Sequence, residues 1–363
     1  MLKLTSSAIA LVWISAVLAP QARAQGFNHI GLASQVLEQH IKPGYQRLHE
    51  SAKTLEKAAS AFCSAKAPAN LAPVRTAFKE TVLAWSGVSH LRFGPIAQER
   101  RLTRMLYWPD RKNLGRKQVR RAIRSRTKST LTLESLNDKS VAMQGLGAIE
   151  QLLYWKADDV FDKSGEDHVY RCGYLTTATK NVANISGELV SGWSSDAEFP
   201  KTLLSPGNDN PRYLKPSEVT LEISKAFLVG LERLRDIKVV GALGMRPNSR
   251  ARLSVPFEMS KLSTRAMQAE LEGLIDMYEN GGLLQVIENQ ESGMGKSINF
   301  EFKQALAAFK RISLPIAKAV QDTVSENNLI DTGFPLKNAR QEAARVLSQA
   351  AGLSLGFNAL DGD

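Results

Sequence analysis

The sequence lacks the short motifs that identify most enzyme classes. It has no Gly-x-Ser-x-Gly element, no phosphate-binding loop and no glycine-rich dinucleotide pattern. The pair His-Glu-x-x-His is also missing, and the chain has only five histidines, which excludes the familiar zinc-protease arrangement. No catalytic residue can therefore be named from a motif.

Long apolar runs are almost absent too. The exception, Ala8 to Ala19, reads AIALVWISAVLA and is too short to span a bilayer, which needs about 20 residues. Lys3 precedes it and Ala22-Arg23-Ala24, a small-x-small cleavage site, follows it. Residues 1–24 are thus predicted to be a cleaved signal peptide of a periplasmic protein, with a membrane anchor or a buried helix as the alternative. No cysteine stands at the cleavage site, so a lipid anchor is not expected.

Cysteine is scarce, with Cys63 and Cys172 the only two. An even number in an oxidising compartment predicts a disulfide between them; the alternative is two unpaired buried thiols. On the loop-entropy account, a bridge closing so long a loop is worth about 4 kcal/mol.

Basic residues exceed acidic ones. The net charge is +11, and two of the 47 basic residues fall in the predicted signal peptide, which leaves 45 against 36 acidic residues, or +9. Export argues against nucleic acid, so an anionic cell surface, a membrane-protein partner or an acidic ligand fits better. Residues 99–128 hold twelve basic side chains against Glu99 and Asp110. They form either a solvated helix or a docking surface.

Helical periodicity dominates the rest of the chain. Apolar residues recur every three or four positions, and prolines and glycines fall between the runs. We predict an all-α protein of two packed four-helix-bundle-like halves: residues 25–204, a connector at 205–216, and residues 217–363. Helices are expected near 36–62 (with a kink or break at Pro43), 71–91, 139–157, 166–193, 216–237, 258–280, 297–327 and 337–352.

One apolar helix carries an unexpected carboxylate. In GLGAIEQLLYW, residues 145–155, the apolar residues follow the i, i+3, i+4, i+7 pattern of one helix face. Gly147 and Glu150 fall on the opposite face. We interpret this helix as contacted on both sides, with Glu150 lining a cleft and Gly147 leaving space for a close approach. The alternative is a salt-bridged Glu150 on a half-buried helix.

The same stretch resembles the hallmark Gly-x-His-x-x-Glu of the imelysin-like protein family, also called the imelysin peptidase family. WSGVSHLRFGP at 85–95 is similar to a family segment ending in Arg-Phe-Gly-Pro, and MLYWPDRKN at 105–113 to its Trp-Pro-Asp element. The ending GFNALDGD at 356–363 resembles that of a periplasmic branch. The resemblance implies two four-helix bundles related by duplication, a periplasmic location and, in several relatives, a link to iron uptake.

The departure from the family pattern is as informative as the match. Gly147 stands where the family has His, and a His and Glu three apart on a helix could hold a metal together, whereas Glu150 alone cannot. His90 is the best candidate to join Glu150 on a divalent or iron cation. Asp361 and Asp363 could add oxygen ligands if the tail folds back. The predicted ligand-binding cleft contains Gly145, Gly147, Glu150, His90, Arg92, Trp108 and Asp110, although Asp110 fits a cap of the next helix better than a ligand role.

Three functions remain open at this point. The first is a periplasmic imelysin-like binding or accessory protein, linked to iron or metal uptake, that holds a small ligand or cation in a cleft between the bundles. The second is a metallopeptidase of the imelysin family, which the replacement of the motif His disfavours. The third is an interaction module that uses the basic helix near 111–128.

Overall fold

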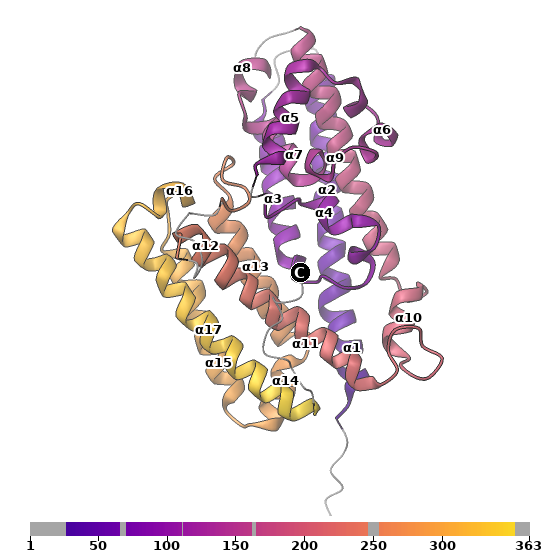
Figure 1. Ribbon diagram of the computed structural model, residues 1–363, viewed down its shortest axis with the longest axis vertical. Coiled ribbons are helices and arrows are strands. Elements are labelled where there is room, and N and C mark those ends of the chain that lie inside the picture. Colours follow the sequence, from indigo (N-terminus) through magenta and orange to yellow (C-terminus); the bar gives the residue numbers. More distant parts are fainter. Residues whose placement is uncertain (1–26, 66–69, 111, 162–164, 246–253, 353–363) are drawn as a thin grey trace, which may run out of the picture.

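The computed structural model describes residues 27–65, 70–110, 112–161, 165–245 and 254–352, and these residues form helices with no β-strand among them (Figure 1). The all-α prediction is confirmed. Among the described helices, none combines the length and the apolar character that a membrane crossing requires. The predicted signal peptide at 1–24 and the tail with Asp361 and Asp363 lie outside the described residues.

The N-terminal half is built on the long helices α2 (Lys42–Ser64), α3 (Ala72–Val88) and α9 (Glu166–Gly192), which stand upright in Figure 1 with shorter helices packed around them. The apolar residues of these helices recur on one face, and this face packs into the core. In α2, for example, Tyr45, Leu48, Ala52, Leu55 and Ala59 are fully buried on one face. The elements are α1 (His29–Val36), η1 (Leu37–Ile41), α2 (Lys42–Ser64), α3 (Ala72–Val88), η2 (Gly94–Arg100), α4 (Arg101–Met105), α5 (Leu114–Ser125), η3 (Lys128–Thr130), α6 (Leu133–Asn137), η4 (Val141–Met143), α7 (Gly145–Tyr154), α8 (Ala157–Phe161), α9 (Glu166–Gly192) and α10 (Glu198–Leu204).

Pro43 does not break the first long helix. The chain stays helical from His29 to Ser64, because a π-helical turn, η1, precedes the proline and α2 restarts with Pro43 in its first turn. Proline cannot donate the backbone hydrogen bond of a continuous helix, and the wider π-helical turn before it lies where the helix accommodates that loss.

The second half of the chain follows α10 and the segment 205–215. It consists of α11 (Pro216–Glu232), the π-helical η5 (Arg233–Val239), α12 (Val240–Leu243), α13 (Ser263–Glu279), α14 (Leu283–Gln290), α15 (Met294–Lys310), α16 (Ile316–Ala319) and α17 (Thr323–Ala351).

Three predicted boundaries in this half are wrong. The helix expected at 297–327 ends at Lys310, and after the short α16 a new helix begins at Thr323. The break expected between 327 and 337 does not exist, because α17 runs through Pro335. The helix expected from 258 begins only at Ser263, because Phe257 and Lys261 have φ angles of 67° and 62°, which a continuous helix does not allow. The short loop before α13 becomes important for the site.

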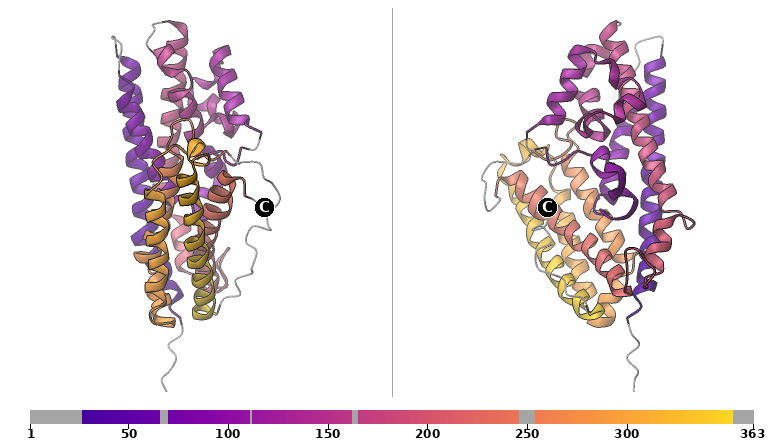
Figure 2. Two further views of the ribbon diagram at one scale, coloured as in Figure 1. Left: turned by 90° about the vertical axis from the view of Figure 1, so that its left-hand side faces the viewer. Right: turned by 45° about the vertical axis from the view of Figure 1, so that its right-hand side comes forward.

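The two halves lie side by side along much of the molecule, and their buried apolar residues form one continuous cluster (Figures 1 and 2). Helix α3 of the first half packs directly on α13 of the second. Their backbones touch at two glycines: a Cβ added to Gly273 would lie 2.0 Å from the carbonyl oxygen of Gly87. Helix α1 also leaves its own half and packs against α11. The seam between the halves is therefore part of the core.

The predicted disulfide is confirmed. Cys63 at the end of α2 is bonded to Cys172 in α9, with a Cα–Cα distance of 5.4 Å and a sequence separation of 109 residues. This bond joins two of the long helices of the N-terminal half.

Candidate functional site

The two glycines of GLGAIE have different tasks. Gly145 opens α7 with a φ angle of +66°, and a Cβ there would lie 2.2 Å from the carbonyl oxygen of Arg104. Only glycine tolerates both that backbone angle and that approach. Gly145 is thus buried against the backbone of α4 and does not line the cleft for which it was predicted.

Gly147 faces open space. A Cβ added to it would find no heavy atom of the described residues within 4 Å. It borders a pocket of about 340 Å³, together with Glu150 one helical turn later. Both halves contribute to the lining of this pocket, which we call the Glu150 pocket: Leu106, Tyr107, Trp108, Asp110, Asn113, Gly115, Arg116, Ala142, Gln144, Gly147, Glu150, Gln151, residues 254–259 and Ala317.

The Glu150 carboxylate is 7% exposed and is held by the loop before α13. Its Oε1 atom accepts hydrogen bonds from the backbone N–H of Ser260, at 2.8 Å, and from the Ser260 hydroxyl, at 2.7 Å. Burial raises the pKa of Glu150 above its ordinary value, and the charge of Glu258 adds to this, while the Ser260 donors oppose it. Glu150 forms no ion pair with another described residue, so the salt-bridged alternative gains no support from the described part of the chain.

Trp108 forms the wall between this pocket and a neighbouring cavity, since it lines both. Its indole N–H donates to the carbonyl of Ser254 at 3.0 Å, and the ammonium of Lys238 lies 5.6 Å from its ring centre. Both partners belong to the C-terminal half. Trp108 therefore bridges the seam with a hydrogen bond and a cation–π contact.

Asp110 caps α5. Its two carboxylate oxygens accept from the backbone N–H groups of Leu114, at 2.7 Å, and Gly115, at 2.8 Å. Asp110 does line the Glu150 pocket, but both oxygens are already engaged at the start of that helix. The capping interpretation is the one that the geometry supports.

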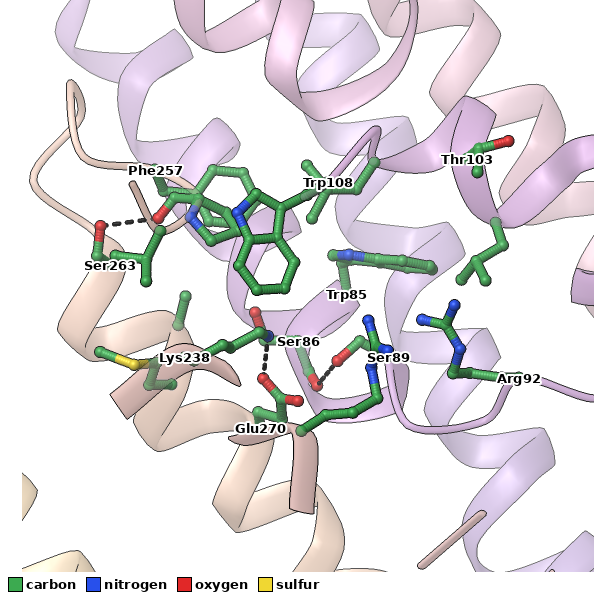
Figure 3. Close-up of a pocket in the computed structure, with 17 residues that line it drawn as sticks. Trp85, Ser86, Ser89, Arg92, Thr103, Trp108, Lys238, Phe257, Ser263 and Glu270 are labelled. Carbon is green, nitrogen blue, oxygen red and sulfur yellow. Dashed lines mark hydrogen bonds and ion pairs between the residues drawn. The ribbon is translucent and has the colours of Figure 1, made fainter. Parts of the chain in front are cut away.

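The neighbouring cavity lies across Trp108, directly on the seam, and we call it the seam cavity (Figure 3). It measures about 60 Å³. Figure 3 shows Lys238 paired with Glu270 on one side, and Arg92 beneath the ring of Trp85 on the other. The lining residues are Trp85, Ser86, Ser89, Arg92, Leu102, Thr103, Leu106, Trp108, Arg233, Lys238, residues 255–257, Ser263, Ala266, Met267 and Glu270.

His90 belongs to a separate buried group. Its Nε2 lies 3.0 Å from Nε2 of His40, whose Nδ1 lies 2.6 Å from a carboxylate oxygen of Asp276. Burial, and then the nearby His40, lower the pKa of His90 well below its ordinary value. Burial alone would raise the pKa of Asp276, but hydrogen bonds from His40 and Asn280 lower it. This group ties η1 and the segment after α3 to α13.

The predicted cleft residues therefore divide. Gly147, Glu150, Trp108 and Asp110 meet in the Glu150 pocket, and Arg92 joins Trp108 in the seam cavity. Gly145 and His90 line neither. Residues that the sequence did not single out are Ser260 at Glu150 and, in the seam cavity, Trp85, Arg233, Lys238 and Glu270. Trp85 begins the segment 85–95 that resembles the family, whereas no local pattern marks the others, which come together only in the folded chain.

The donors around Glu150 do not fit a resident metal ion. The motif His is replaced by Gly147, Oε1 of Glu150 is taken by Ser260, and His90 is engaged with His40. In the described ranges, no three or more His, Cys, Asp or Glu side chains are grouped to hold a metal. The pairing of Glu150 with His90 on a cation thus gains no support, and we derive no metal-dependent step.

Four of the twelve basic residues of segment 99–128 lie on the exposed face of α5. Arg116, Lys117, Arg121 and Arg124 are exposed on this helix. Arg120 differs, because it donates to Oε1 of Gln151 at 2.9 Å and lies 4.8 Å from the ring centre of Trp155. It holds α5 against α7. Arg111 lies outside the described residues.

The helical fold of this chain is found in known structures. An imelysin-like protein from Psychrobacter arcticum 273-4 is similar with a TM-score of 0.75 at 18% identity, over 91% of this chain and 97% of that chain. A protein described as an iron-regulated protein A precursor, from Parabacteroides distasonis ATCC 8503, is similar with a TM-score of 0.69 at 12% identity, over 86% of this chain and 94% of that chain. At these identities the similarity shows the fold.

The family follows from the sequence comparison. The family model Peptidase_M75: Imelysin matches residues 41–339, more than half of the chain, so the chain belongs to the imelysin family. No curated protein matches it. The resemblance stated from the motifs is therefore confirmed.

Proposed function

We propose that this imelysin-family protein is an exported binding protein that holds a small polar ligand in the Glu150 pocket. The observation that supports it is the open space at Gly147. A glycine in a helix is less favourable than leucine by up to about 1 kcal/mol, and nothing in the described structure requires its small size. A pocket of about 340 Å³ beside it falls in the range of small-ligand sites.

Export and a role related to iron form the finer part of the proposal. The sequence pattern of residues 1–24 supports export, and one structural neighbour is described as a precursor of an iron-regulated protein. The same description makes iron complexes reasonable probes. We favour binding over peptidase activity, because the donor set around Glu150 does not fit a catalytic metal.

Calorimetric titration tests the proposal, with iron(III) citrate, free citrate, Cu²⁺ and Zn²⁺ as probes. Gly147→Leu should fill the pocket, so the probe that wild type binds should bind at least about tenfold more weakly. The same substitution should stabilise helix α7, because leucine has a higher helix propensity than glycine. Gly333→Leu is the matched control, since Gly333 lies in α17 and an added Cβ there also meets no described atom within 4 Å. Equal binding by wild type and Gly147→Leu, or no binding of any probe, would refute the proposal.

A second role is favoured by the exposed face of α5. Arg116, Lys117, Arg121 and Arg124 form no ion pair with the residues that the structure describes, so their charges face solvent together. We propose that this face docks on an anionic membrane surface. Sedimentation with phosphatidylglycerol vesicles should show binding that falls with salt and is lost in Arg121→Glu/Arg124→Glu but not in Lys303→Glu/Lys310→Glu on α15. Equal binding of both variants would exclude this face.

A further inference from the structure

The seam cavity contains a buried donor without a partner. Trp85 is 3% exposed, and its indole N–H has no hydrogen-bond acceptor among the described residues. Figure 3 draws its ring nitrogen turned toward Trp108 and Lys238, on the side of the cavity. Buried N–H groups in folded proteins nearly always have a partner, so an acceptor is expected at this point.

The cavity is also positively charged. Arg92, Arg233 and Lys238 are the cations among its described lining residues, and Glu270 is the carboxylate among them. Glu270 is 3% exposed and is paired with Lys238. Arg233 makes no hydrogen bond or ion pair with the described part of the chain, although it lies at the junction of α11 and η5. A cluster of this sign, between low-dielectric walls, attracts an anion.

The serine hydroxyls of the cavity are already used. Ser86 donates to the carbonyl of Val82 at 2.8 Å, Ser89 to that of Ser86 at 3.0 Å, and Ser263 to that of Pro256 at 2.7 Å. The donors left for a ligand are therefore the Trp85 N–H and the guanidinium of Arg233. The indole N–H of Trp85 and the several N–H groups of the Arg233 guanidinium together suit an oxyanion, because an oxyanion accepts several hydrogen bonds at once.

Size agrees with this assignment. The cavity measures about 60 Å³, whereas a single water needs about 10–15 Å³. It shares Leu106, Trp108 and residues 255–257 with the Glu150 pocket, so the two spaces are neighbours. One oxyanion group fits the cavity, and the rest of a larger ligand would have to lie outside it.

We propose that the seam cavity is a binding subsite for the oxyanion group of a ligand, a carboxylate or a phosphate. Trp85 and Arg233 are its donors, and Lys238 paired with Glu270 forms its opposite wall. Because the two contacting residues come from α3 and from the junction of α11 and η5, a bound oxyanion joins the two halves of the molecule. The proposal is independent of the Glu150 pocket.

Calorimetry and thermal unfolding at constant ionic strength test the subsite, with inorganic phosphate, acetate and citrate as probes and chloride as reference. We expect binding of phosphate or of the carboxylates, and whichever binds more tightly identifies the group. Trp85→Phe and Arg233→Gln should each weaken that binding by about ten- to a hundred-fold, as expected for loss of one charge-assisted hydrogen bond.

Matched variants separate the subsite from general damage. Trp193→Phe makes the same change at a fully buried tryptophan outside the cavity, and Arg121→Gln removes an exposed charge on α5; both should bind as wild type. Gly147→Leu should keep oxyanion binding, which distinguishes this site from the Glu150 pocket. If Trp85→Phe does not fold, oxyanion binding by Arg233→Gln tests the proposal. The proposal is overturned when no probe binds, or when Arg233→Gln binds like wild type.

Discussion

The contact between Glu150 and Ser260 offers the sharpest test of the structure. It joins α7 to the loop before α13 across 110 residues of sequence, and it buries a carboxylate with two donors from one serine. A double-mutant cycle of Glu150→Gln and Ser260→Ala measures it. Stability is followed by urea denaturation between pH 4 and pH 9.

The magnitude follows from the bonds present. Ser260→Ala removes the hydroxyl donor at 2.7 Å and keeps the backbone N–H at 2.8 Å. A hydrogen bond to a charged group is worth about 1.5–3 kcal/mol, and one between neutral groups about 0.5–1.5 kcal/mol. With Glu150 ionised, Ser260→Ala should cost the larger amount, and in the Glu150→Gln background the smaller one. The coupling energy is then about 1 to 1.5 kcal/mol.

The pH dependence has a definite sign. Burial raises the pKa of Glu150 above the ordinary 4.5, so the folded protein binds this proton more tightly than the unfolded chain does. The resulting stability is complete below the unfolded pKa and is lost as pH rises through the folded pKa. Wild type should therefore lose more stability than Glu150→Gln as pH rises above about 4.5. Ser260→Ala removes a donor that lowers this pKa, so its loss should extend to higher pH.

Ser263→Ala is the matched control, because its hydroxyl donates to the carbonyl of Pro256 in the same loop without touching Glu150. It should cost the same in wild type and in Glu150→Gln. The reasoning fails if Ser260→Ala also costs the same in both backgrounds at every pH. It fails equally if the stability of Glu150→Gln depends on pH between 4.5 and 8 in parallel with wild type.

Two further predictions concern the frame that carries the site. Gly273→Ala would place a Cβ 2.0 Å from the Gly87 carbonyl, so we expect the free energy of unfolding to fall by about 1–3 kcal/mol or more in urea denaturation. Gly333→Ala, where the added Cβ meets open space, should raise the free energy of unfolding by up to about 1 kcal/mol. Equal effects of the two substitutions would show that α3 and α13 do not touch. The double variant Cys63→Ser/Cys172→Ser should lose about 4–5 kcal/mol of unfolding free energy, because the disulfide spans 109 residues. Adding a reductant should destabilise wild type but leave the stability of this variant unchanged. If the reductant also leaves wild type unchanged, the disulfide is contradicted.

Periodicity predicted the long helices well. The expected helix at 166–193 is α9, Glu166–Gly192, and the expected start at 216 is the start of α11. It failed at Pro335, where tertiary packing carries α17 through a residue that usually ends a helix. It failed again at 258–262, where the helical pattern continues but the backbone of Phe257 and Lys261 turns left-handed.

The sequence alone determined that this is an all-helical protein and that one apolar helix carries a carboxylate opposite a glycine. These features are local, because helix spacing and the fit of a glycine can be recognised within a few turns. Only the tertiary structure decided that Ser260 holds Glu150, that Gly145 packs on a backbone while Gly147 faces a pocket, and that Trp85, Arg233 and Lys238 meet. Those contacts depend on the closeness of α3 and α13, which Gly273 permits because no Cβ blocks the approach of the Gly87 carbonyl from the other half of the chain.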